Sequence, residues 1–304
     1  MTDEIVKYIK NGAIATITMN RPNRANTILP ETMYGINDSL RKANMDDEIK
    51  AIILEGAGDN FCGGFDFSNG LEHTPMVKEE NYDPGRDVQV VTDPYHDYMP
   101  TFMGLHRGGK PTIAKVHGYC VGGGSELALC ADLVIASDDA RFGTPYARVW
   151  GCHLSGMWIY RLGLAKAKYY ALTGDWLSGE EAAKIELINF FYPLEDLDNE
   201  VQKLAEKLTN ILSSQLMCMK LIVNQAYENM GLQSTQTLGP VLDGIMRNMP
   251  ESRGFLSMMP VILALKRSSQ SAMLRLAITV RAQRLSNQGR EASCKMREGI
   301  PSLI

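Results

Sequence analysis

A run of three glycines followed by a glutamate is the segment of this chain best suited to chemistry. Thr112–Val116 is an apolar strand pattern that leads through a turn into Gly122, Gly123 and Gly124 and then into a helical pattern. Glycine lets the backbone approach a ligand closely, and the start of a helix leaves N–H groups without partners. Glu126 follows two residues after the last glycine. Free N–H donors beside a carboxylate are what acyl chemistry on a carbonyl requires.

Glycine-rich turns between a strand and a helix also serve tight packing or phosphate binding. A Walker-type loop would carry a lysine after the glycines, and none follows here. The dinucleotide pattern G-x-G-x-x-G would need a glycine where the chain has Leu127. This segment alone therefore leaves an acyl site and tight packing open.

A second glycine-rich loop repeats the same logic. Gly63 and Gly64 follow an apolar strand pattern over residues 51–54, within the run from Asn60 to Phe67. In a parallel sheet, two such loops lie together at the carboxyl edge, where α/β proteins bind ligands. An oxyanion hole needs two converging donors, so we expect one from each loop.

The elements that must position these loops alternate between strands and helices. Residues 5–9 and 13–19 predict a hairpin around Asn11 and Gly12, and Pro30 predicts a helix start. Ser178 opens a capping box ahead of a further helix. Further strands are predicted at 112–116, 133–136 and 188–191, and helices at 201–212 and 215–227. This alternation predicts an α/β fold with parallel strands.

Two regions lie outside this pattern. Residues 70–100 are polar and rich in proline, which predicts a long surface loop or lid. From Met258 onward the chain is rich in methionine, leucine and arginine. This composition predicts an apolar helix with cationic side chains that packs against another surface, such as a second subunit.

Composition excludes several classes of protein. The chain has 304 residues, is 45% hydrophobic, and carries 31 basic against 35 acidic side chains, so bulk-charge binding to nucleic acid is not expected. Six scattered cysteines without a C-x-x-C pair favour reduced thiols, and five histidines show no metal-binding spacing. The acidic start is no secretory signal and no apolar run reaches bilayer length. We therefore expect a soluble, cytoplasmic protein without a metal site.

Taken together, the motifs resemble the crotonase (enoyl-CoA hydratase/isomerase) superfamily. The resemblance covers roughly residues 5–250 and its motifs come in the family's order, whereas the tail from about Phe255 extends beyond it. The matching segments are residues 20–26, 61–66, 118–128, 131–136 and 142–145, with Leu172-Thr173-Gly174 and Ala182-Ala183.

The resemblance implies a crotonase-like spiral of ββα units over residues 1–195 and a helical C-terminal region over 196–304 that serves oligomerisation and pocket closure. Members bind acyl-coenzyme A thioesters and usually form trimers or dimers of trimers. Coenzyme A then enters as part of the substrate, and no separate cofactor is expected.

The resemblance also implies site residues. The thioester oxygen would accept hydrogen bonds from the backbone N–H groups of Phe65 and Gly123. Glu126 matches one of the two glutamates with which hydratases of this family add water to a 2-enoyl thioester. The expected residues along the substrate and the coenzyme are Arg24, Ala25, Gly64, Asp66, Phe67, Gly122 and Trp150.

The chain departs from the family at the second glutamate. That residue would follow Pro145, but Tyr146 stands there, and the run after it is one residue longer than usual. A phenol with an ordinary pKa near 10 is a different acid from a carboxyl group. Three alternatives follow. Glu126 runs the hydration alone with Tyr146 orienting water or substrate, the fold performs other chemistry such as double-bond isomerisation, C–C hydrolysis or another enolate-type reaction, or the protein is a weakly active or non-catalytic member. His153 is expected to be a surface or structural histidine rather than a base.

Overall fold

The computed structural model describes residues 4–66, 85, 98–147, 151–247 and 249. They belong to one compact unit that spans Met1–Arg253. The C-terminal tail beyond residue 249 lies outside the described residues, and so does most of the predicted loop at 70–100. Residues 98–100 of that loop belong instead to helix α3 (Tyr98–Arg107), so the loop prediction was wrong at its end.

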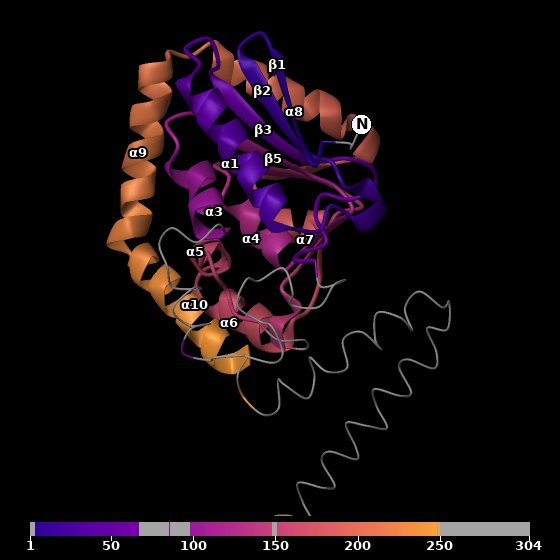
Figure 1. Cartoon of the computed structure of the whole chain (residues 1–304), viewed down its shortest axis with the longest axis vertical. Helices are drawn as coiled ribbons and strands as arrows, with labels where there is room; N and C mark the ends of the chain where they lie inside the picture. The colour runs from indigo at the N-terminus through magenta and orange to yellow at the C-terminus, as the bar shows by residue number, and fades with distance from the viewer. Residues whose placement is uncertain (1–3, 67–84, 86–97, 148–150, 248, 250–304) are drawn as a thin grey trace, which may run out of the picture. The chain divides into compact units, whose positions relative to one another are not determined.

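A six-stranded sheet forms the centre of this unit (Figure 1). Its order is β1 (Val6–Asn11), β2 (Ile14–Met19), β3 (Ala51–Gly56), β5 (Thr112–Val116), β7 (Leu133–Ser137) and β10 (Phe190–Tyr192). Only β1 and β2 pair antiparallel, as the predicted hairpin, and the other neighbours are parallel. The α/β prediction is confirmed. The last strand begins later than predicted because the N–H groups of Leu187 and Ile188 still donate to the carbonyl of Ala182 in the preceding helix.

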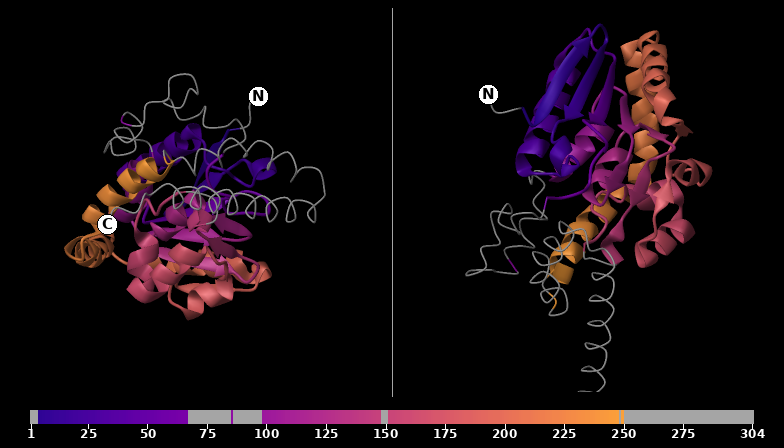
Figure 2. Two further views of the ribbon diagram at one scale, coloured as in Figure 1. Left: turned by 90° about the horizontal axis from the view of Figure 1, so that it is seen from below. Right: turned by 90° about the vertical axis from the view of Figure 1, so that its right-hand side faces the viewer.

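Helices cover both faces of the sheet (Figure 2). Helix α8 (Leu194–Thr209) places Leu197, Val201 and Ala205 in one cluster with strand residues such as Ile53 and Ile113. The larger core on the opposite face takes in residues from α1 (Pro30–Met45), α3 and α4 (Gly123–Leu129). The central strands β3, β5 and β7 are therefore buried on both faces, which is why their sequences are mostly apolar.

Short elements complete the described unit. A second sheet of β6 (Tyr119–Val121), β8 (Arg141–Gly143) and β9 (Leu177–Ser178) was not predicted, because strands of two or three residues show no periodicity. The predicted capping box is present at Ser178, which bonds to Glu181 at the start of α7. The remaining elements are η1 (Pro22–Arg24), η3 (Pro145–Ala147), α5 (Met157–Leu162), α6 (Leu164–Thr173), α7 (Gly179–Lys184), α9 (Ser213–Asn229) and α10 (Leu232–Arg247).

Within the described ranges, no helix combines the length and the hydropathy that a membrane span needs. The five cysteines that the structure describes are free thiols, as predicted.

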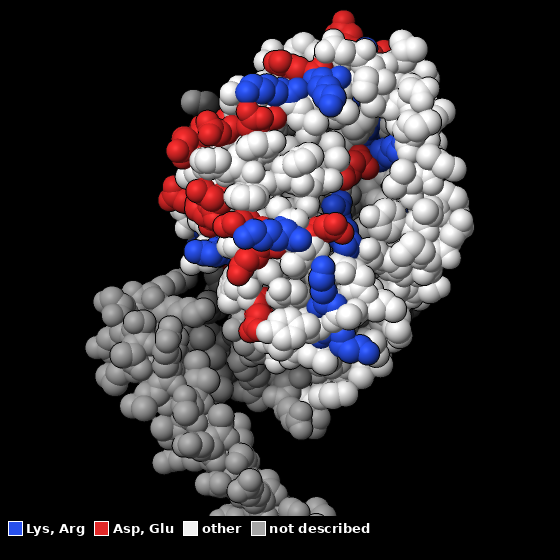
Figure 3. Space-filling view, turned by 180° about the vertical axis from the view of Figure 1, so that it is seen from behind, with Lys and Arg blue, Asp and Glu red and all other residues white. Residues whose placement is uncertain are grey.

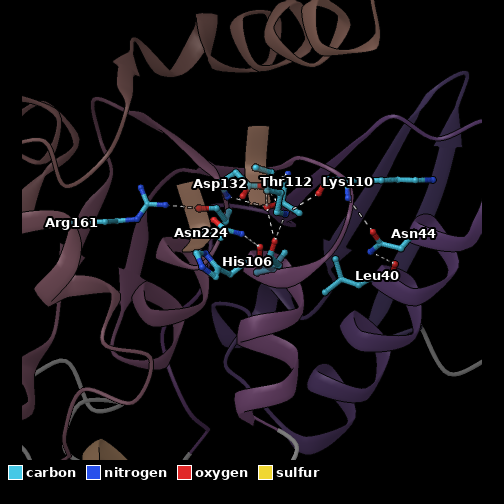
Figure 4. Close-up of polar contacts among 11 residues, drawn as sticks. Leu40, Asn44, His106, Lys110, Thr112, Asp132, Arg161 and Asn224 are labelled. Carbon is cyan, nitrogen blue, oxygen red and sulfur yellow. Dashed lines mark hydrogen bonds and ion pairs between the residues drawn. The ribbon is translucent and has the colours of Figure 1, made fainter. Parts of the chain in front are cut away.

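Buried polar groups join α9 to the end of α3 (Figure 4). Lys220 of α9 forms an ion pair with Asp132 at 2.7 Å, and Asn224 donates to the carbonyl of His106 at 2.6 Å. Asp132 also accepts from the N–H of Thr112 at 2.7 Å. Because buried charges are costly unless they are paired, these contacts fix the position of α9 against the core.

His106 makes the stability of this region depend on pH. Burial, with Lys220 and Arg107 nearby, lowers the pKa of His106 from 6.5 to about 4. The folded state therefore holds the ring neutral, and its contribution to stability is present above pH 6.5 and is lost as the pH falls toward 4. From the two pKa values we expect a loss of about 2 kcal/mol between pH 7 and pH 5. Urea unfolding should show this loss in the wild type and not in His106→Phe, which keeps the edge contact with Tyr227. Equal losses in both proteins would contradict it.

Candidate active site

The first glycine loop lies at the carboxyl end of β5 and β6, where helix α4 begins. Gly122 has φ 51° and ψ −123°, a conformation that residues with a side chain avoid. Its own N–H donates to the carbonyl of Gly143, and its carbonyl accepts from the N–H of Glu126. The backbone is thus fixed on both sides of Gly123, the first residue of α4.

The second glycine loop lies beside the first. The N–H of Cys62 donates to Tyr119 and the N–H of Val121 donates to Cys62, so the loop pairs with β6. Gly64 has φ 94°, and a Cβ on it would lie 2.9 Å from the carbonyl oxygen of Val121 and 3.8 Å from the nitrogen of Gly123. The adjacency of the two loops at one sheet edge is as predicted.

The two N–H groups expected to form an oxyanion hole are available for a ligand. Among the residues that the structure describes, none accepts a hydrogen bond from the N–H of Phe65 or of Gly123. The Phe65 ring stands on the glycine, since a Cβ on Gly123 would come within 2.7 Å of its Cε2. Tyr98 meets the same ring edge-on at 5.0 Å. The aromatic side chain therefore places apolar surface against Gly123.

The close approach of the two loops requires glycine at residue 124. A Cβ there would lie 2.6 Å from the carbonyl oxygen of Cys62 and 2.8 Å from its sulfur. Alanine normally favours a helix over glycine by up to about 1 kcal/mol, but overpacking costs about 1–3 kcal/mol. We expect Gly124→Ala to lower the free energy of unfolding, measured in urea, because the clash is with backbone. Gly109→Ala, where nothing lies closer than 3.9 Å, is the control. Similar stability of the two variants would contradict this account.

A polar frame that sequence analysis missed holds the second loop. Arg21 pairs with Asp66 at 2.8 Å and donates to the carbonyl of Thr27 at 2.5 Å. Asn26 is buried with φ 52°, and its amide donates to the carbonyls of Ala57 and Asn60. Asn26 itself was the sign of this turn in the sequence, because asparagine tolerates a left-handed backbone better than most residues do.

The other residues predicted to bind the substrate lie in different environments. Arg24 ends η1 and is exposed, and Ala25 beside it has φ 48° and accepts from the N–H of Gly63. The Asp66 carboxylate, expected to face a ligand, pairs with Arg21 and so anchors the loop. Phe67 and Trp150 lie outside the described residues.

Glu126 is fully buried and held by three donors. Its Oε2 accepts from the N–H of Ser155 at 3.0 Å and also from the Ser155 hydroxyl. Its Oε1 lies 2.9 Å from Nδ1 of His153. Ser155 and His153 therefore fix the orientation of the carboxylate.

Tyr146 lies between this cluster and the first glycine loop. Its Cε1 is 3.9 Å from where a Cβ on Gly122 would be, and its ring meets the His153 ring edge-on at 5.5 Å. The hydroxyl is buried, with no partner in the described part of the chain. Burial first, and then the charges of Glu126 and Asp243, raise the pKa of Tyr146 well above 10. Tyr146 is therefore a neutral hydrogen-bond donor facing the site.

Of the two expectations for His153, a surface or a structural position, the structure excludes the first. Its side chain is only 11% exposed and touches Glu126, so it is no surface histidine. Ser155 was not considered at all. Both follow η3 in a stretch without periodicity, and only the folding of that stretch onto α4 brings them to the carboxylate.

Comparison with known proteins agrees with this fold. The enoyl-CoA hydratase/isomerase family model matches residues 9–239. The chain belongs to this family, the crotonase superfamily, as its motifs predicted. It is 31% identical over 223 residues to a protein of Dictyostelium discoideum named probable enoyl-CoA hydratase, mitochondrial, covering 72% of this chain and 75% of the relative. It is 30% identical over 237 residues to 1,2-epoxyphenylacetyl-CoA isomerase of Escherichia coli, covering 75% and 85%. A crystal structure of enoyl-CoA hydratase from Mycobacterium smegmatis superposes with a TM-score of 0.78 at 34% identity, covering 86% and 92%.

Proposed function

We propose that this protein hydrates a 2-enoyl-coenzyme A thioester. The observation that carries the proposal is the pair of N–H groups, of Phe65 and Gly123, that donate to no described residue, together with the buried carboxylate of Glu126 in the helix that Gly123 begins. Family membership and relatives named as hydratases support it. Coenzyme A would enter only as part of the substrate, and neither a metal nor another cofactor would take part.

The two N–H groups would bind the thioester oxygen and stabilise the negative charge that develops on it when water adds to C3. Such preorganised donors act most strongly where water is excluded, and the Phe65 ring places apolar surface beside Gly123. The cluster around Glu126 would move the proton, with Tyr146 as a neutral donor that orients water or substrate. Arg24 and Ala25 would lie along the nucleotide part, and Gly64, Gly122, Phe67 and Trp150 along the acyl thioester.

Isomerisation is the second candidate, because Tyr146 replaces the second glutamate and one relative is named as an isomerase. A substrate panel separates the candidates: crotonyl-CoA, a 3-enoyl-CoA and a β-diketone thioester, with products identified by mass spectrometry. Hydration predicts a mass gain of one water on crotonyl-CoA. A shifted double bond or a cleaved product without hydration would favour isomerisation or C–C hydrolysis. Thioester binding without turnover would indicate a non-catalytic acyl-CoA-binding protein.

We also propose that the chain self-associates as a trimer or a dimer of trimers. The long helix α9 exposes several large apolar side chains, and Figure 3 shows few charges on that side of the molecule. They are Met217, Met219, Leu221, Ile222 and Val223, each at least 41% exposed. Light scattering of the full chain should give a mass of three or six subunits; a monomer at every concentration would contradict it.

A further inference from the structure

The carboxylate of Glu126 has little capacity left for a reacting water. Ser155 donates twice to Oε2, and His153 occupies Oε1. A carboxylate offers about four acceptor positions, so three are taken by groups of the protein itself. The side chain is also 0% exposed. This is the environment of a residue that orients a neighbour, rather than of one that meets the substrate.

His153 is the neighbour that it orients. An ionised carboxylate only accepts hydrogen bonds, so Nδ1 of the ring carries the proton in the contact with Glu126. The other nitrogen, Nε2, then has a lone pair and makes no hydrogen bond to any described residue. A histidine whose Nδ1–H is held by a buried carboxylate is the arrangement in which Nε2 acts as a base.

The surroundings fix the ring at the site. Trp158 lies 6.2 Å from the His153 ring and is itself held by a hydrogen bond to Ser125 of α4. Tyr146 touches the ring from the side of the glycine loop. On the α10 side, Gly239 packs directly against the His153 carbonyl.

Among the described residues, the ionisable groups around His153, besides Glu126, are Tyr146, Cys152 and Asp243. Asp243 accepts from the N–H of Cys152 at 3.0 Å. Burial raises the pKa of Cys152, and the pKa of Tyr146 lies well above 10, so both stay protonated near neutral pH. Of these described side chains, only Glu126 accepts a hydrogen bond from Nδ1 of His153.

From this geometry we infer that Nε2 of His153 transfers the proton and that Glu126 is a positioning residue. This rests on the proposed hydration. Nε2 takes a proton from water as the water oxygen bonds to C3, and the C2–C3 π electrons move to the thioester oxygen at Phe65 and Gly123. The imidazolium then returns its proton to C2, which restores the carbonyl and the neutral ring. One residue thus performs both proton steps, which explains how the site can lack a second glutamate.

His153→Asn tests the inference, because the asparagine amide can keep the donor to Glu126 while Nε2 is removed. We measure hydration of crotonyl-CoA, and exchange of the C2 protons of butyryl-CoA in deuterated water by mass spectrometry. The variant should bind butyryl-CoA as the wild type does and lose at least about 100-fold in both reactions. In His153→Ala, added imidazole should restore exchange in proportion to its concentration, a result that a purely structural role would not give.

The outcomes separate the two proposals. An active wild type with near-normal His153→Asn, or His153→Ala that imidazole fails to restore, overturns the role of His153 and leaves hydration standing. If His153→Asn does not fold, rescue of His153→Ala decides. A wild type that neither hydrates nor exchanges any thioester on the panel overturns both proposals.

Discussion

Glu126→Gln should lower kcat by roughly 10²–10⁴-fold while the fold and thioester binding persist. The carboxylate accepts from donors on both of its oxygens, Ser155 on one and His153 on the other. An amide has one acceptor oxygen and one NH₂ group, so one of the two neighbours must face a donor instead of an acceptor. The charge that would stabilise an imidazolium is lost at the same time. Turnover should therefore fall whether Glu126 meets the water itself or acts through His153.

The matched control for this variant is Glu180→Gln, which changes an exposed carboxylate at the start of α7 that pairs with Lys184. It should retain full activity. Circular dichroism and thermal unfolding of both variants exclude misfolding as the cause. Near-normal kcat in Glu126→Gln would remove the carboxylate from the mechanism.

Arg21→Ala should strongly destabilise the protein through the frame that holds the second glycine loop. The Asp66 side chain is 5% exposed and Arg21 18%, so the substitution leaves a buried carboxylate without its guanidinium partner. Breaking such a pair costs about 3–5 kcal/mol, and the partial exposure of Arg21 places the expected loss near the lower end, at about 3 kcal/mol. Activity should fall as well, because Asp66 anchors the loop that presents the N–H of Phe65.

Arg24→Ala is the control for the Arg21 variant, since Arg24 is exposed on the neighbouring helical turn. It should unfold in urea as the wild type does and lose affinity only for the coenzyme part of the substrate. The double variant Arg21→Ala/Asp66→Ala should lose less stability than Arg21→Ala alone, because it removes the buried charge too. Equal stability of Arg21→Ala and Arg24→Ala would contradict the role given to the ion pair.

Local sequence patterns were sufficient to predict much of the fold. The hairpin, the parallel strands and the capping box at Ser178 all depend on neighbours a few residues apart, and the structure has each of them. The short sheet of β6, β8 and β9 depends on pairing between distant segments, and no local pattern revealed it.

The same distinction divides the site. Glycine spacing and motif order by themselves determined the family, the two donor loops and Glu126, because these lie directly after strands of one parallel sheet. Only the tertiary structure decided what surrounds that carboxylate. His153 and Ser155 are 27 and 29 residues away along the chain, in a stretch without regular periodicity, and they reach Glu126 through the packing of that stretch against α4. The protein's donors follow from its sequence, whereas the partner of its buried carboxylate follows from long-range packing, which no spacing of residues encodes.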